Sequence, residues 1–229
     1  MKKIILTMIM TIAVLSLIAG CSSGKTTGSN TVDTTKTVDT TADTTTDNTQ
    51  TTASKEDVDQ DGIPNAVEKT YGTNPYAADT DGDKIDDKND DKPTFADMPF
   101  KTDGTAMSVE ILDARVEDNS TDDHLEIKLK NSGKEIITGL EIYYTIEDNV
   151  ANLTEAYYQD LSDINLKNGE EITLHFDNLV GSGHYAGNNN GIYGTSVNGP
   201  RFTITLHDDK NSFTTFTLDK DTGAAEVAD

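Results

Sequence analysis

Residues 125–146, LEIKLKNSGKEIITGLEIYYTI, decide the fold. Apolar residues occupy every second position on both sides of a turn signal, Asn131-Ser132-Gly133. The alternating positions are Leu125, Ile127 and Leu129 before the turn, and Leu140, Ile142, Tyr144 and Ile146 after it. Because successive side chains of a strand point to opposite faces of a sheet, this period of two predicts two strands, each with one apolar face.

The same pattern continues toward the C-terminus. Alternating apolar residues recur at Ile172, Leu174 and Phe176 and at Phe202, Ile204 and Leu206, and strand-like stretches lie near 106–117, 156–161 and 213–219. Turn residues cluster at 167–169, 198–200 and 208–211. We therefore predict an all-β fold over residues 98–229, an antiparallel β-sandwich of about 7–8 strands with no helix between them.

Upstream, residues 56–97 hold 13 acidic residues against four lysines. Within them, residues 57–68 place oxygen-bearing side chains at positions 1, 3, 5, 9 and 12 of a loop, and Gly62 stands at position 6. Calcium takes about six to eight hard oxygen ligands, and a loop that wraps round it turns sharply at the sixth residue, where glycine is favoured. The spacing therefore predicts a calcium site that begins at Asp57 and is closed by Glu68. The alternative is a solvated acidic stretch, as most acidic runs are.

A second loop, residues 79–90, repeats this spacing 22 residues later. It differs in two places, because Lys84 stands where the glycine belongs and Asp90 replaces the closing glutamate. We therefore expect the second site to be weaker or more irregular than the first.

Between the loops the sequence predicts a short helix. Val67 and Tyr71 lie one helical turn apart, and Gly72 is placed to end the helix before Thr73-Asn74-Pro75. We expect one face of this helix to pack under both loops.

The acidic segment resembles a known family. Residues 57–65 (DVDQDGIPN), 71–75 (YGTNP) and 79–83 (DTDGD) are similar to the bacterial form of the thrombospondin type 3 repeat. The resemblance covers residues 55–93 and implies calcium-wrapped loops that act as stiff spacers between surface modules. Dockerins also use paired loops, but the linker at 72–75 favours the thrombospondin-like family. Carried over by position, the implied ligands are Asp57, Asp59, Asp61, the Ile63 carbonyl and Glu68, then Asp79, Asp81, Asp83, the Ile85 carbonyl and Asp90.

The N-terminus indicates export. Lys2 and Lys3 precede an apolar run, residues 4–19, that is shorter than the roughly 20 apolar residues of a comfortable membrane span. Its end, Ile18-Ala19-Gly20-Cys21, resembles the lipobox of bacterial lipoprotein signal peptides. That resemblance implies removal of residues 1–20 and a diacylglycerol on Cys21, which anchors the protein to the cell membrane or cell surface. The alternative is an ordinary signal peptide with an unrelated cysteine.

Residues 21–55 form the predicted tether. Of the 33 residues from 22 to 54, 14 are threonine and none is aromatic. Such a stretch cannot bury enough apolar surface to fold, so we expect a disordered threonine-rich linker that holds the folded part away from the membrane. The net charge of −23 argues against binding to nucleic acid or anionic headgroups and makes cations the natural partners.

Candidate ligand-binding residues lie in the glycine- and asparagine-rich stretch 181–194. His184, Tyr185 and Tyr193 lie in it, and such loops on a rigid sandwich often contact ligands. The alternative is that the loop only crosses between the sheets with its tyrosines packed down.

Two classes of function remain open. The favoured one is a cell-surface calcium-binding lipoprotein that presents the sandwich as an adhesion or ligand-binding module, with a glycan or surface protein as partner, on a calcium-ordered spacer. The other is an extracytoplasmic hydrolase or envelope-processing factor on the same scaffold. By the parity of neighbouring apolar residues, His175, Asp177 and His207 point outward, where histidines are mostly solvated, so we expect no catalytic residues.

Overall fold

The computed structural model describes residues 55–117 and 124–220, all of which belong to one compact unit that spans residues 49–229. The predicted signal peptide, Cys21 and the threonine-rich linker up to residue 54 lie outside the described residues. Within the described ranges, no helix is both long and apolar enough to span a lipid bilayer.

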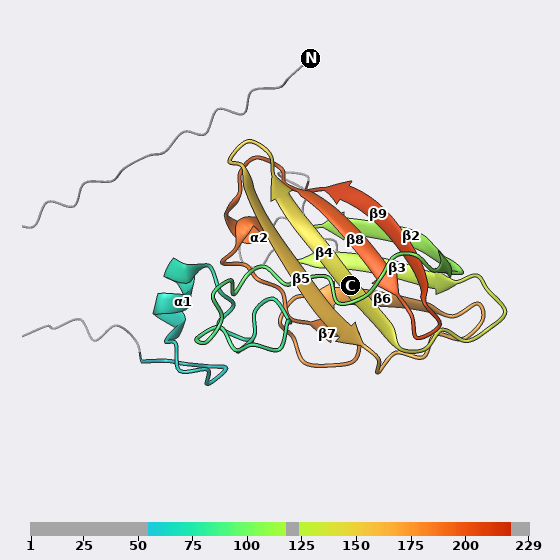
Figure 1. The fold of residues 1–229 in the computed structure, drawn as a ribbon, viewed down its shortest axis with the longest axis horizontal. Coiled ribbons are helices and arrows are strands. Elements are labelled where there is room, and N and C mark those ends of the chain that lie inside the picture. The colour runs from blue at the N-terminus through green and yellow to red at the C-terminus, as the bar shows by residue number, and fades with distance from the viewer. Residues whose placement is uncertain (1–54, 118–123, 221–229) are drawn as a thin grey trace, which may run out of the picture. The chain divides into compact units, whose positions relative to one another are not determined.

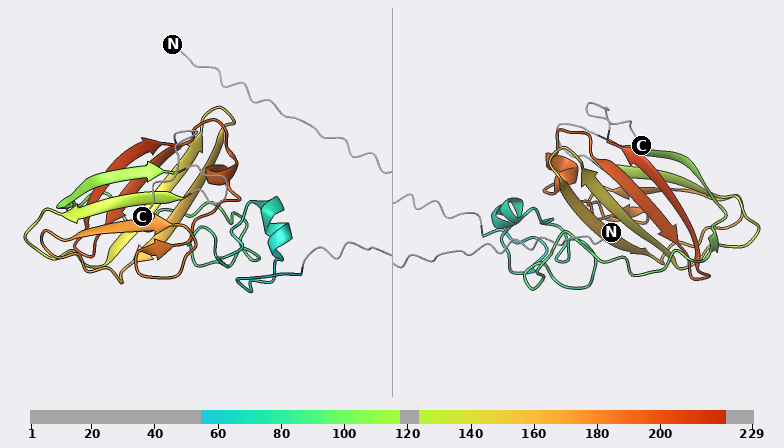
Figure 2. Two further views of the ribbon diagram at one scale, coloured as in Figure 1. Left: turned by 180° about the vertical axis from the view of Figure 1, so that it is seen from behind. Right: turned by 45° about the horizontal axis from the view of Figure 1, so that its top comes forward.

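In these ranges nine strands form two sheets that pack face to face (Figures 1 and 2). The five-stranded sheet has the order β1 (Thr105–Ala106), β9 (Ser212–Asp219), β8 (Arg201–His207), β4 (Leu140–Asp148) and β5 (Leu153–Leu161). The four-stranded sheet has the order β2 (Val109–Val116), β3 (Leu125–Asn131), β6 (Glu171–Phe176) and β7 (His184–Tyr185). The pairs β1–β9 and β6–β7 are short and parallel, and the longer pairs are antiparallel. The predicted all-β sandwich is confirmed.

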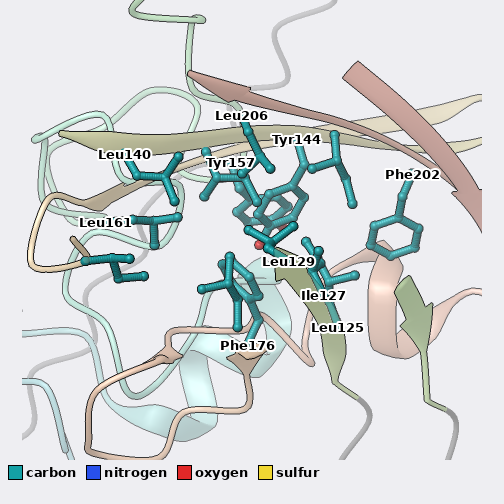
Figure 3. Packing of buried hydrophobic residues seen from close by; sticks show 14 of the residues in the cluster. Leu125, Ile127, Leu129, Leu140, Tyr144, Tyr157, Leu161, Phe176, Phe202 and Leu206 are labelled. Carbon is teal, nitrogen blue, oxygen red and sulfur yellow. The ribbon is translucent and has the colours of Figure 1, made fainter. Parts of the chain in front are cut away.

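The predicted apolar faces meet between the two sheets (Figure 3). Burying one large aliphatic or aromatic side chain contributes about 1.5–3 kcal/mol, so this cluster is the main support of the sandwich. Its buried members from β3, β4, β6 and β8 are Leu125, Ile127, Leu129, Leu140, Ile142, Tyr144, Ile146, Leu174, Phe176, Phe202, Ile204 and Leu206. The period of two therefore identified the buried face of each of these strands correctly.

The glycine- and asparagine-rich stretch 181–194 packs onto the sandwich. It contains β7 and the start of α2 (Ile192–Thr195), a four-residue helix that the sequence analysis did not predict. Tyr193 is only 4% exposed, and its ring meets that of Phe202 edge to face with 5.9 Å between centroids. Tyr193 thus belongs to the core, as in the alternative in which the tyrosines pack down.

Residues 95–100 run across the outer face of the five-stranded sheet (Figure 1). The Tyr143 hydroxyl donates a hydrogen bond to the Ala96 carbonyl oxygen at 3.1 Å, and Phe100 stacks on His207 with 4.5 Å between ring centroids. The His207 side chain is consequently only 12% exposed. The expectation that it would be solvated is wrong, because a distant part of the chain covers the outer face.

Candidate calcium-binding loops

Both acidic loops fold through the same side-chain-to-backbone hydrogen bonds. In the first loop, Asp57 at position 1 accepts from the N–H groups of positions 4 and 6, at 2.8 and 3.2 Å. In the second loop, Asp79 does the same at 2.8 and 2.7 Å. The aspartates at positions 3 and 5 each accept from the N–H two residues later, in both loops. Because short polar side chains that bond nearby backbone favour turns, the aspartate spacing itself dictates this shape.

The turns need a left-handed backbone at positions 4 and 6. In the first loop these are Gln60 (φ 67°) and Gly62 (φ 91°), and in the second they are Gly82 (φ 82°) and Lys84 (φ 77°). Each loop thus has one glycine and one residue whose side chain makes this conformation cost roughly 1–2 kcal/mol. The second turn has the same backbone as the first, because the glycine has moved to position 4 and Lys84 forms the same turn as Gly62. That the second site is the weaker one stays a prediction.

The carboxylates of each loop converge. One oxygen from each of the aspartates at positions 1, 3 and 5 lies within 4.8 Å of the other two, in both loops. Further oxygens are buried without a hydrogen-bond partner among the described residues: Asp59 Oδ2, Asp61 Oδ2, Glu68 Oε2, Asp81 Oδ2 and Asp90 Oδ2. Leaving a buried polar atom unpaired costs about 1–3 kcal/mol, and more for a charged group. Such a set of oxygens is suited to a bound cation.

Glu68 closes the first loop from α1 (Asn65–Tyr71). Its side chain is fully buried. Burial, together with the negative charges of Asp59 and Asp61, raises the pKa of Glu68 to about 7. The charges of Asp59 and Asp61 thus act on Glu68, and its role as the closing ligand at position 12 stays a prediction.

The helix α1 ends at the predicted residue, but the face that it buries is not the one that carries Tyr71. Gly72 adopts φ 82°, and its N–H donates to the Glu68 carbonyl oxygen at 2.7 Å. Tyr71, however, is 66% exposed, and Glu68 is the buried residue of the helix. The buried face of the helix is therefore the one that carries Glu68, and not the one that carries Tyr71. That one face packs under both loops stays a prediction.

The two loops bury different carboxylates, and in the second loop Asp83 is exposed. Asp81 is fully buried, whereas Asp57, Asp59 and Asp61 of the first loop are half-buried. Burial raises the pKa of Asp81 to about 7, and the negative charge of Asp90 contributes to the rise. Asp90 is therefore close enough for its charge to act on Asp81, and its role as a ligand stays a prediction.

Asp87 is a site residue that the sequence analysis missed. It is 5% exposed, and its carboxylate accepts hydrogen bonds from the Thr80 N–H at 2.8 Å and the Thr80 hydroxyl at 2.6 Å. Burial raises its pKa to about 6, and the charges of Asp61 and Asp79 raise it as well. Since these aspartates belong to different loops, Asp87 is near both sites. Its register could have identified it, because Asp87 and Asn65 both occupy position 9.

The donor sets of the two loops fit calcium. Their side-chain donors are all oxygen atoms, which calcium prefers over the nitrogen and sulfur ligands favoured by zinc. The N–H groups of Ile63 and Ile85 are held by Asp61 and Asp83, at 2.6 and 2.9 Å, so both position-7 residues are ordered within the turn. We therefore treat both loops as candidate calcium sites.

The second loop is docked on the edge strand β5. The Tyr158 N–H donates to the Asp81 carbonyl oxygen at 2.7 Å, and a parallel bridge between Phe95 and Ala156 continues the pairing. A Cβ on Gly82 would lie 2.0 Å from the Tyr158 carbonyl oxygen, so this approach needs glycine. The acidic segment thus covers an edge that would otherwise present unpaired backbone groups.

Two asparagines from the stretch 181–194 hold the chain where it leaves α1. The Asn188 side-chain amide donates to the Gly72 carbonyl oxygen at 2.7 Å, and that of Asn190 donates to the Thr73 carbonyl oxygen at 2.7 Å. The stretch that we expected to contact a ligand therefore also binds the acidic segment.

The three predicted ligand-binding residues do not form one site. His184 Nδ1 lies 2.8 Å from Asp177 Oδ2, and its ring stacks on that of His175 with 4.9 Å between centroids. Tyr185 packs against the core cluster, and Tyr193 lies within it. The His175 side chain is only 13% exposed, so the expectation of a solvated outward histidine is wrong here too.

Comparisons with known proteins do not assign a family. No protein-family model matches the chain, and a search of curated proteins finds no match. The fold and the loops nevertheless define its class, a β-sandwich module preceded by an acidic loop–helix–loop segment.

Some solved structures are weakly similar. The trimeric lipoprotein SadB of Salmonella enterica has 15% identity and a TM-score of 0.27, covering 46% of this chain and 49% of SadB. OgpA from Akkermansia muciniphila has 10% identity and a TM-score of 0.31, covering 65% of this chain and 35% of OgpA. A β-glucosidase from Listeria innocua in complex with glucose has 14% identity and a TM-score of 0.27, covering 52% of this chain and 16% of the enzyme. This chain thus spans less than half of each of these proteins, and TM-scores this low carry no argument about its function.

Proposed function

We propose that this protein is a lipid-anchored, calcium-binding protein of the bacterial cell surface, which presents its β-sandwich as an adhesion or ligand-binding module. The observation that carries the calcium proposal is the set of buried carboxylate oxygens without hydrogen-bond partners among the described residues, above all those of Glu68 and Asp81. The lipid anchor rests on the resemblance of residues 18–21 to a lipobox.

The proposed role of calcium is structural. A divalent cation in each loop would compensate the negative charges whose burial and mutual repulsion raise the pKa of Glu68 and Asp81. With that repulsion offset, the turns of both loops and the end of α1 keep the positions in which they bond to β5 and to the stretch 181–194. Calcium would thereby order the junction between the tether and the sandwich.

Calcium titration of the whole chain tests this proposal. We expect two calcium ions to bind per chain. Glu68→Gln should weaken calcium binding at the first loop by about 10–100-fold, because glutamine keeps the side-chain shape and removes the charge. Asp86→Asn is a matched control, since Asp86 is exposed and is not a proposed ligand. It removes the same charge from the same segment, and its effect should stay within about threefold.

Limited proteolysis gives an independent readout. Chelation with EDTA should increase cutting between residues 55 and 95 and leave the strands of the sandwich protected, because their core contains no calcium ligands. Two results together would rule the calcium sites out. They are the same proteolysis pattern with and without chelator, and no heat change in calorimetry when calcium is added.

A polar cleft supports a glycan as the ligand of the module. The cleft has a volume of about 420 Å³ and is lined by residues 74–76, 177–179 and 189–190. Tyr76 is 61% exposed, and the amide residues Asn178, Asn189 and Asn190 line the cleft with it. An exposed aromatic ring beside amide groups suits a sugar, which stacks on the ring and hydrogen-bonds to the amides.

A glycan array probed with the calcium-loaded protein tests the ligand class. Tyr76→Ala should abolish retention of any bound glycan, and Tyr71→Ala is the control because Tyr71 is equally exposed, at 66%, and does not line this cleft. No retained glycan, or equal losses in the two variants, would contradict the assignment of a sugar to this cleft without affecting the calcium proposal.

The alternative, an extracytoplasmic hydrolase, has less support. Its strongest feature is the Asp177–His184 pair, with 2.8 Å between Oδ2 and Nδ1. We favour binding because His184 stacks on His175 on the outer side of the sheet and Tyr193 lies in the core, so these residues do not converge on one pocket.

A further inference from the structure

A second group of possible metal ligands lies outside the acidic loops, on the outer face of the four-stranded sheet. Strand register builds it, since Arg115 of β2 pairs with Glu126 of β3, and Glu126 pairs with His175 of β6. Next to this row, the Glu117 N–H donates to the His124 carbonyl oxygen at 2.9 Å. Because residues two apart on a strand share a face, these five side chains lie on one side of the sheet.

The distances between the donor atoms are those of a small metal site. His124 Nε2 lies 3.4 Å from Glu117 Oε2, and His175 Nδ1 lies 3.6 Å from Glu126 Oε2. One donor atom each of His124, Glu126 and His175 lies within 4.8 Å of the other two. In a tetrahedral zinc site with bonds of about 2.0–2.1 Å, neighbouring donor atoms lie about 3.3–3.4 Å apart. The two observed pairs are close to this spacing.

Arg115 holds both glutamates by the oxygen that faces away from the histidines. Its Nη2 lies 2.7 Å from Glu126 Oε1, and its Nε lies 2.8 Å from Glu117 Oε1. Each glutamate therefore uses Oε1 for Arg115 and turns Oε2 toward an imidazole nitrogen. Outer groups that hold metal ligands in this way fix the orientation in which the ligands meet the ion.

Burial and donor type suit a cation at this position. His124 is 5% exposed, and its Nε2 makes no hydrogen bond among the described residues. Glu117 and Glu126 are also buried, and both face Arg115. Buried carboxylates beside imidazole nitrogens are donors that a divalent ion can bind.

We propose that His124, His175, Glu126 and Glu117 form a binding site for a transition-metal dication of the zinc class. Imidazole nitrogen with carboxylate oxygen suits Zn²⁺, Cu²⁺ or Ni²⁺, whereas calcium prefers oxygen ligands alone. The protein would then hold two kinds of cation at separate places, a hard ion in the acidic loops and a borderline ion on the sheet. This site does not depend on the calcium proposal.

Zinc titration of the full chain, with calcium in excess to saturate the acidic loops, tests the proposal. We expect one zinc ion per chain, and we expect Co²⁺ to give the visible absorption of a four-coordinate site. His124→Gln should weaken zinc binding by about 100-fold or more, since it removes a ligand. His207→Gln is the matched control, because its imidazole is also mostly buried and also lies beside a glutamate, at 3.1 Å, but on the other sheet.

Three results would overturn the proposal: no calcium-resistant zinc binding by the wild-type chain, unchanged binding in His124→Gln, or equal losses in His124→Gln and His207→Gln. Circular dichroism shows whether the His124 variant folds. If it does not, Glu126→Gln replaces it, because glutamine keeps an oxygen for Arg115 while removing the ligand charge. Cobalt absorption of the wild-type chain decides the question without any variant.

Discussion

The two acidic loops, residues 57–68 and 79–90, have the same turns but different supports. The first is closed by Glu68 and is held to the sandwich through the chain that leaves α1. The second pairs directly with β5 and buries Asp81 completely. Aspartate spacing dictates the turn, whereas the surrounding fold decides how far the turn depends on a cation. We therefore expect the first loop to lose its shape before the second when calcium is removed.

The strongest test of this difference is Gly82→Ala. The new Cβ would lie 2.0 Å from the Tyr158 carbonyl oxygen, at a residue with φ 82°, so the loop has to leave the strand. We expect the free energy of unfolding to fall by about 2–4 kcal/mol, from overpacking combined with the left-handed backbone. Urea unfolding in calcium measures this loss.

Gly62→Ala is the matched control in the first loop. Its Cβ would meet only the flexible end of Lys88, at 2.7 Å, so the expected loss is about 1 kcal/mol. Equal losses in the two alanine variants would show that the docking of the second loop on β5 contributes nothing to stability.

The next largest effect is expected from Asn188→Ala, which weakens the support of the first loop. It removes the hydrogen bond to the Gly72 carbonyl oxygen and the one to the Tyr157 hydroxyl, at 2.7 and 3.0 Å. Because both sit in a largely buried region, we expect a loss of about 1–3 kcal/mol. Hydrogen exchange should show faster opening around α1 than around residues 79–90. Faster exchange around residues 79–90 than around α1 would contradict the expectation that the first loop opens before the second.

A change of pH is expected to have a smaller effect on the stability of the calcium-free protein. The pKa values of Glu68 and Asp81 are about 7 and that of Asp87 is about 6, all above those of unfolded chains, near 4. Without calcium, the folded protein therefore holds more protons than the unfolded chain. The stability that these three groups contribute is therefore greatest below about pH 4 and is lost as the pH rises through 6 and 7.

Calcium binding has the opposite dependence, because the cation displaces these protons. We expect affinity to fall by up to about tenfold per displaced proton for each pH unit below 7. Calorimetry at two pH values, on either side of 7, measures the change and the protons released. An affinity that does not change between them would mean that these carboxylates do not bind the cation.

The smallest effect is expected from replacing the non-glycine residues in the left-handed turns. Lys84→Gly and Gln60→Gly each relieve backbone strain but make the unfolded chain more flexible, so each should stabilise by no more than about 1 kcal/mol. Urea midpoints in calcium measure both. If Lys84→Gly strengthens calcium binding and Gln60→Gly does not, the second turn is the compromised one, as the sequence alone suggested.

Several features of this protein were predictable because they depend on neighbours in the chain. The period of two identified the inward faces of β3, β4, β6 and β8, since strand geometry forces alternate side chains to opposite faces. The aspartates at 57 and 79 specified their own turns, and Gly72 specified the end of α1. The sequence alone was therefore sufficient for the sandwich class and for the shape of the acidic loops.

Other features depended on contacts between distant residues. Periodicity placed His175 and His207 on outer faces, but it could not say that His184 and Phe100 would cover them. Nor could it show that Asp87 lies near both loops. The group of His124, Glu126 and His175 depends on which strands pair and in what register. Local sequence determines which way a side chain points, and only the tertiary structure decides what it meets there, because the partner arrives from elsewhere in the chain.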